Sequence, residues 1–387
     1  MTADVSSRIR AAFEENFASG REVGAAVSVW QNGREIVNLC GGFRDAAREV
    51  PWAPDTLVPI WSATKGMAAA CALHALERAG LDPACRMADI WPEFARGGKD
   101  RITVGEVLSH TAGLGALDRT DLSVMDHEGV ARAIENQAPF AGPGEGPGYG
   151  PRTFGFLADE LVRRLDGGTP IGQYWRREFG NPLDLELWIG LPEEEHGRAA
   201  SILPPRAGDP PQNPAFTEAM ALPDSLTRKA FSSPGGLLAV SAMNSPAARS
   251  ASLPSMGGIG SASSLARFYS ILASGGACGG KPVFGRKAMS WMSTRRSQGF
   301  DKILRLETSF SAGFMMDPLD ASGRKLREIL GPSPGAFGHP GAGGSLGFAD
   351  PDSGIGFGYV MNQMEQGVLP GGRANALVRA LYSGSFS

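Results

Sequence analysis

Ser62 and Lys65 stand three residues apart, where a short apolar run, residues 57–61, gives way to a predicted helix. On the first turn of a helix, residues three apart share a face, so the Lys65 amine can reach the Ser62 hydroxyl. A serine hydroxyl is a weak nucleophile that needs a neighbouring base, and a lysine can be that base when burial lowers its pKa. The N–H groups at the helix N-terminus would stabilise an oxyanion. The spacing favours nucleophilic catalysis by Ser62, although a capping serine beside a solvated lysine has the same spacing.

The elements around this pair follow from the hydrophobic pattern. Apolar side chains recur every four residues near the N-terminus and predict an amphipathic helix, at Ile9, Phe13 and Phe17. Asn32-Gly33 lies between two β-rich runs, residues 25–30 and 35–39, and predicts a hairpin. Helices are predicted for residues 66–79, 104–109, 156–165, 263–273 and 373–382, and strands for residues 57–61, 345–348 and 355–361.

Strands and helices at both ends of the chain enclose a middle with helices and long Gly/Pro/Ser-rich connections, such as residues 202–254. This arrangement predicts an α+β fold in which the terminal thirds complete one antiparallel sheet. We expect residues 1–61 and 256–387 to form that sheet domain, and residues 62–255 to form a helical, loop-rich domain that carries the nucleophile. The long connections would form the walls of a cleft between the two domains.

Composition narrows the class of protein. The chain has 387 residues, 42% of them hydrophobic, with 37 basic and 40 acidic side chains and a net charge of −3. Such a chain can bury a core, and its balanced charge gives no electrostatic reason to bind nucleic acid or an anionic membrane. Its four cysteines form neither a disulfide framework nor a Cys-x-x-Cys pair. Because we find neither a secretory signal nor an apolar run of about 18 residues, we expect a cytoplasmic location. We also expect an enzyme that needs no metal or cofactor.

Three further motifs follow Ser62 in order. Residues 102–114 read ITVGEVLSHTAGL, Tyr149-Gly150-Pro151 precedes a predicted helix, and His339-Pro340-Gly341 precedes Ala342 near the end. Together with Ser-x-x-Lys at a strand-to-helix junction, these motifs resemble the serine β-lactamase and penicillin-binding protein superfamily. The resemblance spans about three quarters of the chain. It implies a β-lactamase-like fold, with an antiparallel sheet flanked by terminal helices, an inserted helical region and a cleft between them.

Two departures from the superfamily pattern point to one branch of it. The Tyr-x-Asn motif of the lactamases is Tyr149-Gly150-Pro151 here, without the amide side chain, and the lysine of Lys-Thr-Gly is replaced by His339. A Tyr-x-x-x-Thr-Phe-Gly segment and a histidine in the Lys-Thr-Gly place resemble the family VIII carboxylesterases and related acyltransferases. The resemblance therefore implies an esterase. A histidine with an ordinary pKa near 6.5 would also be mostly neutral at pH 7.

The resemblance assigns roles to individual residues. Ser62 attacks the acyl carbon of an ester, and Lys65 or Tyr149 takes its proton. Tyr149, as phenolate or through Lys65, is the base or proton carrier for the leaving alcohol and the incoming water. The backbone N–H groups of Ser62 and Ala342 form the oxyanion hole. His339 and Gly341 are expected to contact the substrate.

Alternative functions follow from the same residues. A β-lactamase, a D-alanyl-D-alanine peptidase-like hydrolase and a transacylase share the chemistry, while a catalytically silent binding protein would need none of Ser62, Lys65 and Tyr149. Gly-Gly-Ser-Leu-Gly around Ser345 fits the nucleophile motif of α/β-hydrolases, but that motif needs a following helix and a later histidine. His110 is expected to fix its loop. We therefore expect a serine carboxylesterase that acts on small or medium-chain esters, in an oligomeric state that the sequence leaves open.

Overall fold

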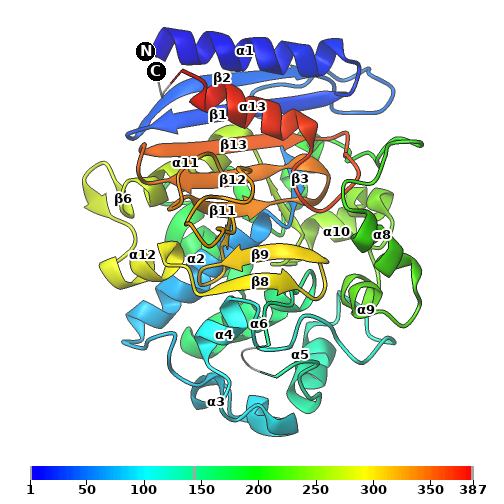
Figure 1. Cartoon of the computed structure of the whole chain (residues 1–387), viewed down its shortest axis with the longest axis vertical. Coiled ribbons are helices and arrows are strands. Elements are labelled where there is room, and N and C mark those ends of the chain that lie inside the picture. The colour runs from blue at the N-terminus through cyan, green and yellow to red at the C-terminus, as the bar shows by residue number, and fades with distance from the viewer. Residues whose placement is uncertain (1, 143–144, 385–387) are drawn as a thin grey trace.

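The computed structural model describes residues 2–142 and 145–384 (Figure 1). Within them, an eight-stranded antiparallel sheet has the order β2-β1-β13-β12-β11-β10-β9-β8. Its strands are β1 (Gly24–Gln31), β2 (Arg34–Gly42), β8 (Ser297–Asp301), β9 (Leu306–Phe310), β10 (Met315–Met316), β11 (Phe337–Pro340), β12 (Leu346–Asp350) and β13 (Ile355–Met361). The N-terminal hairpin thus continues directly into the C-terminal strands, and this confirms the predicted sheet.

The N-terminal elements form as the sequence predicts. Asn32 and Gly33 both have left-handed backbone angles, with φ of +49° and +77°, and they turn β1 back into β2. Helix α1 (Thr2–Ala18) buries Ile9 and Phe13 and packs beside α13 (Gly372–Tyr382). Figure 1 shows these two terminal helices lying along the same end of the sheet.

A second, three-stranded sheet connects the two parts of the chain. It consists of β3 (Val58–Trp61), β5 (Gly258–Gly260) and β4 (Leu187–Ile189), in the order β3-β5-β4. Strand β4 belongs to the region 62–255, whereas its partner β5 lies beyond it. The small sheet therefore crosses the expected boundary, and the division into two domains stays a prediction. A two-stranded sheet joins β6 (Ala277–Cys278) and β7 (Lys281–Pro282).

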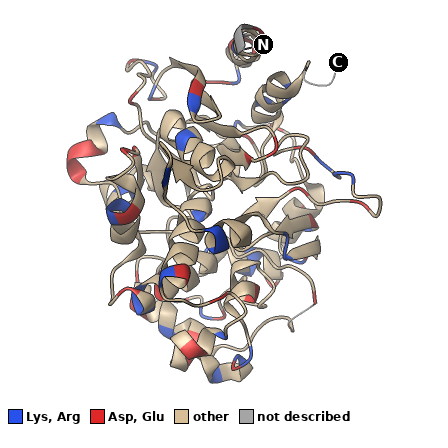
Figure 2. Ribbon diagram, turned by 90° about the vertical axis from the view of Figure 1, so that its left-hand side faces the viewer, with Lys and Arg blue, Asp and Glu red and all other residues tan. Residues whose placement is uncertain are grey.

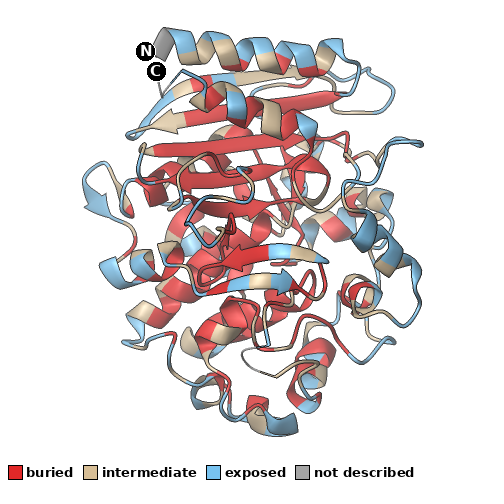
Figure 3. Cartoon of the chain, viewed as in Figure 1, coloured by how far each residue is buried: buried red, intermediate tan, exposed pale blue. Residues whose placement is uncertain are grey.

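Helix α2 (Thr64–Arg78) runs through the centre of the molecule. Twelve of its residues are buried, and it contacts α6, α7, α12 and β11. The other helices are α3 (Met87–Ile90), α4 (Val104–Leu108), α5 (His127–Asn136), α6 (Thr153–Leu165), α7 (Ile171–Trp175), α8 (Pro214–Ala221), α9 (Leu226–Ser232), α10 (Pro246–Ser250), α11 (Ala262–Ala273) and α12 (Arg286–Ser293). Further helical turns, not of the α type, are η1 (Pro92–Gly98), η2 (Arg176–Gly180), η3 (Glu193–Arg198), η4 (Val240–Asn244) and η5 (Ala342–Gly344). Figure 3 shows that α2 and the central strands are largely buried, as expected for a helix with apolar residues on most sides.

Residues 202–254, expected to be irregular, contain three short helices and the turn η4. The side chains of Asn213, Ser225 and Ser245 accept hydrogen bonds from backbone N–H groups at the starts of α8, α9 and α10. Residues read as loop formers are therefore N-caps, and helices this short carry too few apolar residues to show a period.

Charge is distributed without a dominant sign. Basic and acidic residues are interspersed along the ribbon in the view of Figure 2. Among the described residues, no helix is both long and apolar enough to span a membrane, and no group of three or more histidine, cysteine or acidic side chains is arranged to hold a metal ion.

Candidate active site

Ser62 lies on the turn between β3 and α2. Trp61 has a φ of +49°, a left-handed conformation that is rare for a bulky residue, and the chain changes direction there. The N–H of Ala63 donates to the carbonyl oxygen of Ile60 at 3.1 Å, and the N–H of Lys65 donates to that of Ser62 at 2.9 Å. Ser62 is half-buried, whereas the residues that follow it are buried. Its hydroxyl therefore sits where a buried helix begins.

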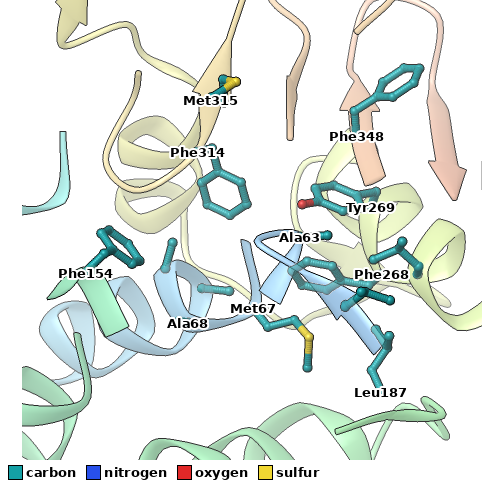
Figure 4. Close-up of a cluster of buried hydrophobic side chains, with 14 of the residues drawn as sticks. Ala63, Met67, Ala68, Phe154, Leu187, Phe268, Tyr269, Phe314, Met315 and Phe348 are labelled. Atoms are coloured by element: carbon teal, nitrogen blue, oxygen red, sulfur yellow. The ribbon is translucent and has the colours of Figure 1, made fainter. Parts of the chain in front are cut away.

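Two kinds of contact fix the start of α2. The Thr64 hydroxyl accepts from the N–H of Gly258 at 2.8 Å and donates to the carbonyl oxygen of Trp61 at 2.5 Å, which ties the helix to β5. On the apolar side, Figure 4 shows side chains of the first helical turns within a cluster of large hydrophobic residues. The labelled members of that cluster are Ala63, Met67, Ala68, Phe154, Leu187, Phe268, Tyr269, Phe314, Met315 and Phe348.

The amine of Lys65 is buried beside the Ser62 hydroxyl. Lys65 is 0% exposed, and its Nζ lies 3.3 Å from Ser62 Oγ. The amine also donates to the carbonyl oxygens of Pro151 at 3.1 Å and Ser255 at 2.9 Å. Burial lowers the pKa of Lys65 well below its ordinary value. The arrangement favours a neutral amine, which is the form that can act as a base.

Tyr149 reaches the same point from the loop before α6. Its hydroxyl is hydrogen-bonded to Ser62, and Lys65 Nζ lies 4.8 Å from the centre of its ring. Burial raises the pKa of Tyr149 above its ordinary value, the hydrogen bond with Ser62 partly opposes this, and the Asp301 carboxylate raises it further. Tyr149 is therefore a neutral phenol in the resting protein, and the structure brings the three predicted catalytic residues together.

The predicted oxyanion turn follows β11. A Cβ at Gly341 would lie 2.2 Å from the carbonyl oxygen of Ile60, so only glycine allows this turn to approach β3. Among the described residues, the backbone N–H groups of Ser62 and Ala342 donate to no backbone carbonyl. Both residues are half-buried. The two N–H groups thus stand free at the end of β3 and the end of β11, as an oxyanion hole requires.

His339 lies on β11 with its ring 5.9 Å from that of Tyr149. Its Nδ1–H donates to the carbonyl oxygen of Pro340 at 2.8 Å, and its Nε2 has no partner among the described residues. Burial, followed by the nearby Lys65, lowers the pKa of His339 to about 3. At neutral pH the imidazole is therefore uncharged, and the fraction that carries a charge is smaller than for a histidine with a pKa near 6.5. Because His339 is only 1% exposed, its contact with a substrate stays a prediction.

The site also contains groups that sequence reasoning missed. The carbonyl oxygens of Pro151 and Ser255 hold the Lys65 amine, and the Asp301 carboxylate accepts from the N–H of Tyr149. In the sequence, Pro151 is notable because it has no amide side chain. In the structure, its backbone carbonyl oxygen accepts a hydrogen bond from the Lys65 amine. Every residue carries a carbonyl, so no sequence signal distinguishes these two.

Ser345, the alternative nucleophile, has no place in such a site. It is fully buried, and strand β12 rather than a helix follows it. The nucleophile motif of α/β-hydrolases needs a strand, a sharp turn and then a helix. The Gly-Gly-Ser-Leu-Gly segment therefore spans the end of the turn after β11 and the first two residues of β12.

Comparison with known proteins gives consistent matches over the whole chain. Residues 9–380 match the family described as Beta-lactamase. The chain is 32% identical over 363 residues to Esterase/beta-lactamase LipL of Mycobacterium tuberculosis (strain ATCC 25618 / H37Rv), and the match covers 91% of this chain and 80% of that protein.

Solved structures match equally well. A penicillin-binding protein homolog from Caulobacter crescentus superposes with a TM-score of 0.86 and 37% sequence identity, over 98% of this chain and 97% of that chain. A family VIII carboxylesterase has a TM-score of 0.85 and 34% identity, with the same coverage of 98% and 97%.

Proposed function

This chain belongs to the beta-lactamase family and is a serine hydrolase of that fold, and on this premise we propose that it is a carboxylesterase for small or medium-chain esters. The resemblance and the fold class read from the sequence are confirmed. The observation that carries the proposal is the convergence of Ser62 Oγ, Lys65 Nζ and the Tyr149 hydroxyl. In the proposed reaction the acyl group is transferred to Ser62 and then to water.

Lys65 is proposed to be the base that activates Ser62. A neutral amine has two N–H groups and one lone pair. The carbonyl oxygens of Pro151 and Ser255 take the two N–H groups, which leaves the lone pair directed towards Ser62 Oγ at 3.3 Å. As the Ser62 oxygen bonds to the acyl carbon, its proton passes to the Lys65 nitrogen. The lowered pKa of Lys65 and its two carbonyl contacts thus support its role as the base.

Tyr149 is proposed to be the proton carrier to the leaving group. As a neutral phenol next to Ser62, it donates its proton to the alcohol oxygen when the carbon–oxygen bond of the ester breaks, and it regains a proton from the Lys65 ammonium. In the second half of the reaction the direction reverses, because water must lose a proton as it attacks the acyl-enzyme. A phenol that stays protonated at rest suits this role.

The negative charge that develops on the carbonyl oxygen is proposed to be bound by Ser62 N–H and Ala342 N–H. These donors are fixed before the substrate arrives, so they need no reorganisation during the reaction. The N-terminal end of α2 adds positive partial charge at the same place. Gly341 serves this site through its small size, because it lets the Ala342 turn approach β3.

The acyl chain of the substrate is proposed to extend towards a cavity near this turn. A cavity of about 500 Å3 is lined in part by Phe216, Leu306 and Gly367. The carbonyl oxygen of Gly367 accepts from the N–H of Gly343 at 3.1 Å, which joins one lining residue of the cavity to the turn that carries Ala342. Its volume lies within the ~300–1,000 Å3 of small-molecule sites, which supports a chain longer than acetyl.

Esters are proposed to be better substrates than β-lactams. In the lactamase pattern an amide side chain and a lysine cation contact the substrate, whereas this chain has Pro151 and a neutral His339 in those places. Proline offers neither an N–H nor a polar side chain. An ester with an alcohol leaving group needs neither contact.

The experiment that tests the proposal is a panel of p-nitrophenyl esters from acetate to laurate, run beside nitrocefin, with intact-mass detection of the acyl-enzyme. We expect turnover of the esters and one added acyl mass that maps to Ser62. Absence of ester turnover, or an acyl group on another residue, would overturn it. Slow acylation by β-lactams is a second candidate activity, since Ser62, Lys65 and Tyr149 are all retained and one relative is named an esterase/beta-lactamase. A cytoplasmic location, and partners limited to a small-molecule ester, stay predictions from the sequence.

A further inference from the structure

The loop that carries Tyr149 is held by three consecutive backbone N–H groups. Gly148 N–H donates to the carbonyl oxygen of His110 at 2.8 Å, and Gly150 N–H donates to Nδ1 of the same histidine at 3.2 Å. Tyr149 N–H donates to the Asp301 carboxylate, with nitrogen–oxygen distances of 3.1 and 3.3 Å. Two residues far apart in the sequence therefore fix the backbone at Tyr149 and on both sides of it.

His110 follows the end of α4 and has a left-handed φ of +61°. Its ring centre lies 5.0 Å from that of Tyr149 and 4.6 Å from that of Phe310, so the imidazole is packed against the ring whose backbone it holds. Burial lowers the pKa of His110 well below its ordinary value, and the nearby titratable groups of Lys65 and His339 act in the same direction. The neutral imidazole is the form that can accept the Gly150 N–H at Nδ1.

Asp301 ends β8 and is 0% exposed. Besides Tyr149 N–H, its carboxylate accepts from the N–H groups of Ile303 at 2.9 Å and Leu304 at 2.8 Å. A buried carboxylate is costly unless such donors satisfy it, so the loop and the aspartate stabilise each other. Loss of the carboxylate would leave Tyr149 N–H without an acceptor at a buried position.

We infer that His110 and Asp301 are positioning residues that hold the Tyr149 hydroxyl at Ser62, a role that rests on the proposed function of Tyr149 as proton carrier. Both act on the loop backbone, and the hydroxyl follows because the Tyr149 ring is packed against His110. A displacement of about 1 Å at a reacting centre lowers a rate by about 10²-fold. The pair should therefore control kcat much more than KM.

A matched pair of His110 variants tests this inference. In asparagine, the acceptor Oδ1 is separated from Cα by the same number of bonds as Nδ1 in histidine. Asparagine also tolerates the positive φ found at this position. We expect His110→Asn to keep kcat within about fivefold of the wild type, and His110→Leu, which has no acceptor, to lower it about 10²-fold. KM for p-nitrophenyl butyrate should change by less than about threefold in both variants.

Repeating the substitution in a Tyr149→Phe background separates positioning from a general structural role. Once the hydroxyl is absent, His110→Leu should lower the remaining kcat by less than about threefold, because the two residues act as one unit. A loss of kcat by the same factor in both backgrounds would overturn the inference. Asp301→Asn keeps the size of the side chain but replaces one of its two acceptor oxygens by an NH2 donor, so the N–H groups of Tyr149, Ile303 and Leu304 must share one oxygen. This variant is measured in both backgrounds and decides the question if His110→Leu does not fold.

His74→Leu is the control. His74 lies on α2 and is half-buried, and its Nδ1 pairs with the hydroxyl of Tyr174 at 2.8 Å. We expect this variant to lose thermal stability and to keep wild-type kcat. Wild-type kcat in both His110→Leu and Asp301→Asn, with Tyr149→Phe still impaired, would overturn the positioning role and leave the proposed function standing. Wild-type kcat in Tyr149→Phe would remove Tyr149 from the reaction and the inference with it.

Discussion

The amine of Lys65 and the hydroxyl of Tyr149 meet at Ser62, but they are held there in different ways. Lys65 belongs to a buried helix, and its amine hydrogen-bonds to backbone carbonyl oxygens, those of Pro151 and Ser255. Tyr149 belongs to a loop whose N–H groups donate mainly to side chains. The acceptors are His110 Nδ1, the Asp301 carboxylate and the backbone carbonyl oxygen of His110.

This difference determines which neighbours can be exchanged. A carbonyl acceptor survives substitution of the residue that carries it, provided the backbone keeps its course. A side-chain acceptor is lost as soon as the residue type changes. The lysine side of the site should therefore tolerate changes around it, and the tyrosine side should not.

The largest effect is expected when Ser62 Oγ is removed, the atom that both Lys65 and Tyr149 approach. Ser62→Ala should lower kcat/KM for p-nitrophenyl butyrate by about 10⁴-fold or more, since loss of a nucleophile leaves only binding and the oxyanion hole. A phosphonate probe should label the wild type at Ser62 and should not label this variant. Ser345→Ala is the matched control, and its probe adduct should stay on Ser62. A probe adduct on Ser345 would overturn the assignment of the nucleophile.

The next largest effect is expected when the Lys65 amine or the Tyr149 hydroxyl is removed separately. Lys65→Met and Tyr149→Phe should each lower kcat by about 10²–10⁴-fold, the usual contribution of a positioned acid or base. The double variant should lose far less than the product of the two factors, because the residues act as a unit. Steady-state kcat is measured for the two single variants and the double variant. A loss of kcat in the double variant equal to the product of the two single losses would contradict a shared mechanism.

The Lys65 side also predicts the direction of the pH dependence. Burial lowers the pKa of Lys65, and the base is active when it is neutral, so kcat/KM should rise with pH through that lowered pKa and then level off. Activity that first appears only near pH 10.5, the ordinary lysine value, would contradict a buried neutral amine.

The same contrast explains what the sequence could predict. Ser62 and Lys65 lie on one helical turn, and a short-range pattern of spacing and helix-forming residues reveals them. Tyr149 was found through a motif. Asp301 has no motif around it, and it meets Tyr149 from 152 positions away, which only the folded sheet brings about.

Local composition also misled the prediction of elements. The segments that form β8 and β9, SQGFD and LETSF, have few β-branched residues and no clear alternation, so neither strand was predicted. They are strands because each pairs with a neighbour over five residues. Pairing between strands outweighs local propensity, whereas the apolar α2 and the Asn32-Gly33 turn are specified by the chain itself.

A smaller effect concerns the polar groups that this site lacks. We expect kcat/KM for short-chain p-nitrophenyl esters to exceed that for nitrocefin by about 10²-fold or more, since Pro151 and neutral His339 cannot replace an amide and a cation. Steady-state rates on the same preparation measure this ratio. Equal efficiency on nitrocefin would mean that other groups supply these contacts.

Chain length probes the cavity beside the oxyanion turn. Leu306→Trp should fill part of it and lower kcat/KM for p-nitrophenyl octanoate about tenfold, while that for the acetate should change by less than about twofold. Leu326→Trp is the control, because Leu326 is 53% exposed and does not line the cavity. An equal loss on both esters in Leu306→Trp would show that the chain does not enter this cavity.

The smallest expected effect on activity is at Ser255, on the lysine side. Its carbonyl holds Lys65, but its hydroxyl only accepts from Gly155 N–H at 2.6 Å and donates to the Arg152 carbonyl oxygen at 2.9 Å. Ser255→Ala keeps the carbonyl, so kcat should stay within about threefold of the wild type. The buried Gly155 N–H loses its acceptor, so the free energy of unfolding should fall by about 1–3 kcal/mol in denaturant titration. A 10²-fold loss of kcat, comparable with that expected for His110→Leu, would show that the two sides are held alike.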